Sequence, residues 1–181
     1  MEHLAILSKK GKFLNKILSG EKLIESRWYK FKRPPFGLIS KGDIIYFKDS
    51  GKPVSAKAEV EKVITYKELN EEKIKQIIIK YGKLIGIDLN SLDKIKDKKI
   101  CILVFLKNPQ KIKPFKIDKT GYGNMTAWIT VKDIKNLKKS KKITKEEVIL
   151  VNKAVEFEMQ EFNSKKAKKY SLEEIKKKSD F

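Results

Sequence analysis

Apolar and polar residues alternate most clearly at positions 54–66, where Val54, Ala56, Ala58 and Val60 are separated by polar side chains. A period of two is typical of a strand with one buried face. The run IIYFK precedes it across the turn DSGKP, so the two segments are predicted to form an antiparallel hairpin of the kind used in small barrels. Further strands are predicted at residues 3–8, 23–29, 100–106 and 127–131. The chain is expected to become less regular after Pro109.

Helical spacing of apolar residues appears in three other places. Residues 10–19 are predicted to form a helix that ends at Gly20, and Asn70 is a candidate N-cap for a helix over 70–81. A second short helix is predicted from Ser91. These helices lie between strands, and the order of elements indicates an α+β fold.

The composition changes at residue 138, where the basic run KKSKK begins. Thr144 and Glu147 have the spacing of a capping box, which predicts a long helix, and a second box at residues 171–174 opens the last basic segment. The first helix has an apolar stripe that is expected to pack against something: Val148, Val151, Val155, Met159 and Phe162. The predicted domains are therefore residues 1–137 and a helical extension at 138–181.

Charge narrows the function. The 43 Lys and Arg residues against 23 Asp and Glu give a formal net charge of +20 and a pI near 9.8, which favours a polyanionic partner. Adaptation to heat would also enrich lysine, but with matching glutamate. The single cysteine, Cys101, lies in an apolar run and the single histidine is His3, so neither a disulfide nor a structural zinc is expected. No signal peptide or membrane span is evident, which predicts a cytoplasmic protein. No glycine-rich phosphate loop or metal-binding motif is visible, so no cofactor is expected.

The segment SGEKLIESRWYKFKRPPFG, residues 19–37, carries the candidate site. Gly20 allows a left-handed turn, after which Lys22 is expected to reach into a cleft. Glu25 and Arg27 share one face of a strand, and the planar guanidinium suits a phosphate or a guanine edge. Aromatic residues interleaved with cations are typical of proteins that bind single-stranded nucleic acid. The residues predicted to bind nucleic acid are Lys22, Arg27, Tyr29, Lys30, Lys32, Arg33 and Phe36.

A purely structural interpretation is available for the same residues. Exposed ion pairs contribute roughly 0–1 kcal/mol, so the charges at residues 22, 25 and 27 can equally form an ordinary strand edge. Trp28 and Tyr46 are as readily explained as core residues, and Trp128 fits either a core or a cleft.

The motif GEKLIESR at residues 20–27, followed by KGDIIYFKDSGKPVSAKAEVEKV, resembles the ASCH domain family. It is similar above all to archaeal members that carry ESRWYKxKRPPxG early and GxGNMxAWI late. The resemblance covers about residues 1–137 and implies a PUA-like fold, a small mixed β-barrel with peripheral helices. A C-terminal helical extension lies outside it.

The family includes an amidohydrolase of acetylated cytidine in which the motif lysine works with a threonine. Lys22 matches the lysine, but Glu25 occupies the threonine position, so the activity is not carried over intact. Three hypotheses remain. The first is an RNA-binding module with a basic cleft at Lys22, Glu25 and Arg27. The second is a hydrolase of a modified nucleoside or RNA with Lys22 and Glu25 as catalytic residues. The third is docking of a protein partner or a second copy through the C-terminal helix.

Overall fold

A mixed β-sheet forms the first of two units into which the chain divides, Met1–Lys139 and Ser140–Phe181. The computed structural model describes residues 1–138, 153 and 155–163. In sheet order, the six strands of the described residues are β2 (Ile24–Tyr29), β5 (Ile100–Phe115), β4 (Val54–Tyr66), β3 (Ile44–Asp49), β1 (Glu2–Leu7) and β6 (Trp128–Val131). β1 runs parallel to β3, and the other neighbouring pairs are antiparallel. This α+β half-barrel confirms the predicted fold class.

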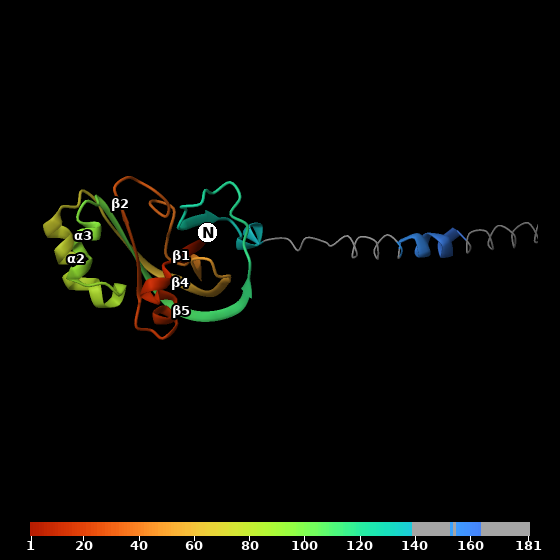
Figure 1. Cartoon of the computed structure of the whole chain (residues 1–181), viewed down its shortest axis with the longest axis horizontal. Helices are drawn as coiled ribbons and strands as arrows, with labels where there is room; N and C mark the ends of the chain where they lie inside the picture. Colours follow the sequence, from red (N-terminus) through yellow and green to blue (C-terminus); the bar gives the residue numbers. More distant parts are fainter. Residues whose placement is uncertain (139–152, 154, 164–181) are drawn as a thin grey trace, which may run out of the picture. The chain divides into compact units, whose positions relative to one another are not determined.

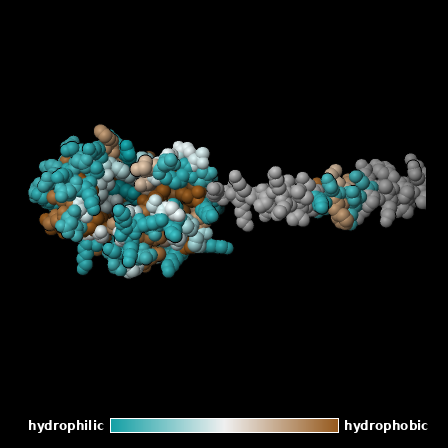
Figure 2. All heavy atoms as spheres, viewed as in Figure 1, coloured by the Kyte–Doolittle hydropathy of each residue, from teal (hydrophilic) through white to brown (hydrophobic). Residues whose placement is uncertain are grey.

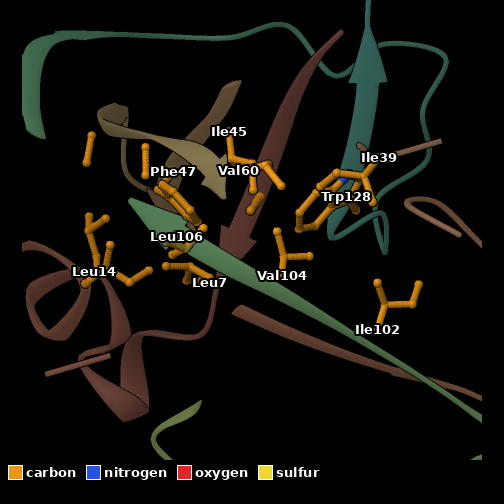
Figure 3. Packing of buried hydrophobic residues seen from close by; sticks show 14 of the residues in the cluster. Leu7, Leu14, Ile39, Ile45, Phe47, Val60, Ile102, Val104, Leu106 and Trp128 are labelled. Atoms are coloured by element: carbon orange, nitrogen blue, oxygen red, sulfur yellow. The ribbon is translucent and has the colours of Figure 1, made fainter. Parts of the chain in front are cut away.

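The alternating pattern in β4 is the reason for its two-sided character. Val54, Ala56, Ala58 and Val60 are at most 2% exposed, whereas the residues between them are only partly buried. β3 and β4 form the predicted hairpin. Figure 3 shows the core on this side of the sheet, where Phe47, Val60, Val104 and Trp128 pack together with other apolar side chains.

The helices contribute to two apolar clusters of the sheet: Leu14 and Ile17 belong to the core just described, and Ile74 and Ile85 belong to a second cluster. α1 (Phe13–Leu18) is shorter than predicted because Lys12 adopts a left-handed φ of 47°, which separates it from the 3-10 turn Lys9–Gly11. α2 (Glu71–Ile85) starts at Asn70, whose side chain accepts a hydrogen bond from the Lys73 N–H at 2.9 Å. α2 extends beyond the predicted end because Ile85 is buried in a second apolar cluster. Two short elements follow, η2 (Leu89–Ser91) and α3 (Leu92–Ile95), and η3 (Ile134–Leu137) follows β6. In Figure 1, α2 and α3 lie together at the end of the sheet beside β2.

The sequence predicted a strand over 100–106 and a less regular chain after Pro109, but β5 continues to Phe115 and the irregular stretch begins after it. The pairing of β5 with β4 shifts register between Lys57 and Glu59, opposite the residues around Pro109. Asn108 has a φ of 51° at this irregularity. A bulge leaves a residue out of the hydrogen-bond ladder, so the strand tolerates a proline that cannot donate.

The curl of the sheet brings its two edge strands toward each other. β2 and β6 stand at opposite ends of the strand order, yet the guanidinium carbon of Arg27 on β2 lies 5.0 Å from the centre of the Trp128 ring on β6. We call the region between these two unpaired edges the seam. An unpaired edge leaves room that a closed barrel would fill with ladder hydrogen bonds.

In the second unit, residues 155–163 are helical. Val155, Met159 and Phe162, three members of the predicted apolar stripe, are between 50% and 67% exposed. The predicted helix starts at Thr144 and at Ser171 lie outside the described residues. Within the described part of the chain, no helix is both long enough and apolar enough to cross a membrane.

Candidate nucleic-acid-binding site

Lys22 is buried rather than displayed in a cleft. It follows the left-handed turn at Gly20, but only 3% of the residue is exposed. Its ammonium group donates to the carbonyl oxygens of Ile24 at 2.7 Å and Ile85 at 2.6 Å and lies 3.3 Å from Glu25 Oε2. Burial lowers the pKa of Lys22, while the Glu25 carboxylate acts in the opposite direction. An ammonium has three donors, of which the two carbonyls take two, and the Glu25 carboxylate lies within ion-pair distance of the same nitrogen.

Glu25 connects Lys22 to Arg27. Its second oxygen, Oε1, lies 3.1 Å from Arg27 Nη2, and Glu25 itself is 5% exposed. The contact is close enough for an ion pair, but its angles do not make a hydrogen bond. Arg27 Nε and Nη2 consequently have no hydrogen-bond acceptor among the described residues, although both atoms are buried. These two atoms form one edge of the guanidinium, the kind of edge that binds two oxygens of a phosphate or the O6 and N7 of guanine.

A cavity of about 720 Å³ opens at the seam, and its lining residue Trp128 contacts the guanidinium of Arg27, which does not itself line the cavity. Tyr29 lines it from β2, Trp128 and Thr130 line it from β6, and the segment 121–127 closes a further side. The volume is in the range of small-molecule sites and admits a nucleoside. Apolar and aromatic walls with a few polar groups are typical of a site that binds a planar ring.

The segment 121–127 is held in place by Lys119. Its ammonium donates to the carbonyl oxygens of Asn124 at 3.2 Å and Thr126 at 3.0 Å. Gly121 and Gly123 have φ values of 85° and 77°, which other residues adopt only with strain. The loop is therefore a braced wall of the cavity, and Met125 at its tip is 95% exposed.

Trp128 is fixed by a buried polar network behind the cavity. Its indole N–H donates to His3 Nδ1 at 3.2 Å, and the Thr130 hydroxyl lies 3.0 Å from the same nitrogen. Because Nδ1 accepts from the indole, the His3 proton is on Nε2, which donates to Asp43 Oδ2 at 3.1 Å. Burial lowers the pKa of His3 despite the opposing carboxylate of Asp43. A neutral imidazole with this tautomer locks the indole orientation.

Asp43 receives several donors at the far end of this network. Burial acts to raise the pKa of Asp43, but hydrogen bonds from the Met1 amino group, the Ser40 N–H and His3 outweigh it, so the pKa is lowered. Asp43 is therefore an anionic anchor for His3.

The other predicted binding residues lie on two different faces of the segment 30–38. Tyr29 and Arg33 line the cavity, and the Tyr29 hydroxyl donates to the Pro34 carbonyl at 2.8 Å. Lys30, Lys32 and Phe36 instead line a second depression of about 800 Å³ together with Phe31, Lys67 and Lys99. The sequence predicted that these residues form one wall of a cleft. In the structure they line two separate depressions.

Sequence reasoning missed the wall at 121–127 and the lysines that face Phe36 from elsewhere in the chain. The two glycines and Trp128 were visible as a segment, but nothing local indicated that it faces Tyr29. Trp28 and Tyr46 are partly buried against apolar clusters, and Cys101 is fully buried. Burial raises the pKa of the Cys101 thiol, which disfavours a nucleophilic role. In the part of the chain that the structure describes, no group of three His, Cys, Asp or Glu residues is placed to hold a metal ion.

No protein-family model matches the sequence, and a comparison with curated proteins gives no match. Solved structures of the ASCH protein of Zymomonas mobilis are similar in fold. That protein aligns with 75% of this chain and 90% of its own length at 18% identity, with a TM-score of 0.55. A point mutant of it aligns with 75% of this chain and 93% of its own length at 17% identity, with a TM-score of 0.57. The chain therefore has the fold of the ASCH domain, as the motif at residues 20–27 predicted.

Proposed function

We propose that this protein is an RNA-binding module that takes one unpaired base or nucleoside into the cavity at the seam. Trp128 and Tyr29 supply aromatic walls, Arg27 supplies a planar set of donors, and Arg33 contributes positive charge at the same cavity. The net charge of +20 attracts the phosphate backbone.

The observation that carries this proposal is the unpaired edge of Arg27. A buried donor without an acceptor costs roughly 1–3 kcal/mol of stability. Two such donors on Arg27 are therefore unfavourable unless a ligand accepts hydrogen bonds from them. Glu25 Oε1 lies 3.1 Å from Nη2 and Trp128 contacts the face of the guanidinium, so Nε is the donor on this edge with neither a hydrogen-bond acceptor nor an ion-pair partner, and a ligand would share Nη2 with Glu25. The geometry suits a guanine edge or a phosphate.

Hydrolysis by Lys22 and Glu25 is the alternative. Both residues are at most 5% exposed, and Lys22 already uses its donors within the protein. A general acid or base must come within hydrogen-bond reach of the proton it transfers. The observed packing therefore favours a role for Lys22 in positioning Glu25, and through it Arg27, over a role in turnover.

The test compares wild-type protein with Arg27→Lys by fluorescence anisotropy on a labelled mixed-sequence RNA, with the products followed by mass spectrometry. Arg27→Lys keeps the charge but removes the two-donor edge, which is worth roughly 1–3 kcal/mol in bidentate base recognition. We expect a loss of affinity of about tenfold and no product with either protein. Lys83→Ala is the matched control, because Lys83 is exposed on α2 and lines none of the cavities described above.

Two results would contradict the proposal. Equal affinity for wild type and Arg27→Lys would show that the cavity does not recognise the RNA. Product that forms with wild type and not with Glu25→Gln would identify a hydrolase instead.

A further inference from the structure

The second depression, beside segment 30–38, carries an excess of positive charge, because Glu68 is the single acid among its lining residues and four lysines line it. Lys32, Lys67 and Lys99 line the second depression and form no ion pair among the described residues. Lys30, which also lines it, is paired with Asp97 at 2.8 Å. Three unpaired cations in one depression repel one another and favour an anionic ligand.

Phe36 gathers two of these cations. The ammonium groups of Lys32 and Lys67 lie 5.5 Å and 5.6 Å from the centre of its ring, and the half-buried ring packs on the first apolar cluster. Lys32 and Lys67 come from segments far apart in the sequence, so the ring fixes a pair of charges that neither segment would place alone. Phe36 is thus a platform for cations rather than for a base.

Phe31 is the aromatic residue that is available for stacking at this depression. It is 73% exposed at this depression. Bases stack on exposed aromatic rings only when they are unpaired. A membrane surface would take up several apolar side chains beside the lysines, whereas the apolar lining residues Leu69 and Ile100 are buried and leave Phe31 as the exposed one. An acidic peptide would use the lysines and leave the ring without a partner.

We propose that this depression, which we call the flanking groove, binds the nucleotides next to the one held in the cavity. Lys32 and Lys67 contact phosphates, and Phe31 stacks on an unpaired base. The ligand is then a single strand that passes around segment 30–38 from one face to the other. This inference rests on the proposed function, because it takes the cavity as the site of the first base.

The experiment uses three labelled ligands: a single nucleotide, which can fill only the cavity; a single strand of about 16 nucleotides, the upper end of known site sizes; and the same strand annealed into a duplex. Each is titrated by anisotropy over a series of salt concentrations with wild type, Lys32→Ala/Lys67→Ala, Phe31→Ala, Arg27→Lys and the control Lys83→Ala. Circular dichroism checks the fold of every variant.

We expect Lys32→Ala/Lys67→Ala to weaken binding of the long RNA about tenfold and to reduce the slope of log K against log salt by about 1.4, or 0.7 for each phosphate contact. Phe31→Ala should weaken the long RNA about fivefold or more, which corresponds to the loss of one stacked base. Neither change should alter binding of the single nucleotide, whereas Arg27→Lys should weaken both the single nucleotide and the long single strand.

Failure of this inference is distinguishable from failure of the proposed function. If the groove variants bind the long RNA with wild-type affinity and slope while Arg27→Lys weakens it, the flanking groove is wrong and the cavity stands. If the groove variants lose as much affinity for the duplex as for the single strand, the ligand class is wrong. If wild type binds neither the single nucleotide nor the long single strand, the proposed function itself fails and the groove with it.

Discussion

Glu25 is the residue on which the charge balance of the site depends. It lies between a buried ammonium and a largely buried guanidinium, with 3.3 Å to Lys22 and 3.1 Å to Arg27. A buried pair contributes little net stability, but removing one partner leaves the other charged and unpaired. Here the loss of one carboxylate would leave two cations without a counter-ion.

Glu25→Gln is therefore expected to destabilise the protein by about 3–5 kcal/mol. The measurement is the free energy of unfolding from urea titration. Glu71→Gln is the matched control, because Glu71 forms a solvent-exposed pair with Lys75, and the loss of such a pair should change the free energy of unfolding little. Similar losses of unfolding free energy for both variants would show that the burial of Lys22, Glu25 and Arg27 does not increase the cost of removing the carboxylate.

His3 predicts a pH dependence of stability. Its pKa in the folded state lies below the usual histidine value of 6.5. Just below pH 6.5, therefore, His3 is protonated in the unfolded chain but still neutral in the folded protein. Stability should be complete above pH 6.5 and fall as the pH drops toward the folded pKa. The single imidazole resonance in a proton NMR titration of the native protein should have a midpoint below 6.5. A midpoint above 6.5 would contradict the neutral tautomer that holds Trp128.

For single residues, the sequence predicted which side chains form the charged cluster better than it predicted whether they are buried or exposed. The motif identified Lys22, Glu25 and Arg27, and their contacts follow from their spacing. The burial of Lys22 did not, because its shortest hydrogen bond is to Ile85, 63 positions away, and no local pattern reports such a contact.

Among the structural elements, two irregular segments line the proposed binding surface. Segment 30–38 separates the cavity from the flanking groove, and the loop at 121–127 completes the cavity wall. Both are positioned by side chains that donate to backbone carbonyls, Tyr29 in the first and Lys119 in the second.

Lys119→Ala should weaken RNA binding several-fold, because the loop loses the ammonium that holds two of its carbonyls. The change in the free energy of unfolding should stay within about 1–3 kcal/mol, as expected for two hydrogen bonds near the surface. Anisotropy and urea titration provide the two measurements. Lys116→Ala, which removes an exposed lysine three positions earlier, is expected to leave both unchanged. If Lys119→Ala and Lys116→Ala weakened RNA binding equally, the loss of positive charge alone would explain the effect, and the bracing of the loop would not.

Regular elements were more predictable than these segments. The period-two pattern of β4 and the Asn70 cap of α2 are local signals, and both appear in the structure at the predicted residues. β5 runs past Pro109 because a bulge removes the need for its missing N–H, and a bulge depends on the partner strand. The course of segment 30–38 also depends on what it packs against.

For the whole molecule, the net charge of +20 is distributed well beyond the two sites. Figure 2 shows hydrophilic side chains over most of the visible face of residues 1–138. Such a surface increases affinity for any polyanion and makes it depend on salt. The fold class followed from the order of elements and the motif resemblance, whereas the meeting of β2 and β6 at the seam is a tertiary contact that no segment encodes alone.

Lys141→Ala/Lys142→Ala tests the general contribution of charge. These two lysines belong to the basic run that begins at residue 138, outside the described residues, and we expect their loss to lower the salt slope by up to about 1.4. The ratio of affinities between wild type and Arg27→Lys should persist in this background. A variant that lost this ratio would indicate that recognition at the cavity depends on the basic run.

The pairing of β6 with β1 joins Trp128 to Ala5, so the last strand of the sheet is aligned with the first. Contacts of such sequence separation carry a large loop-closure entropy and slow folding. During synthesis, β1 to β5 can associate while Trp128, Thr130 and the loop before them are still being made. The sheet is then an unfinished half-barrel with an exposed β1 edge, and the cavity at the seam forms only when β6 pairs with that edge.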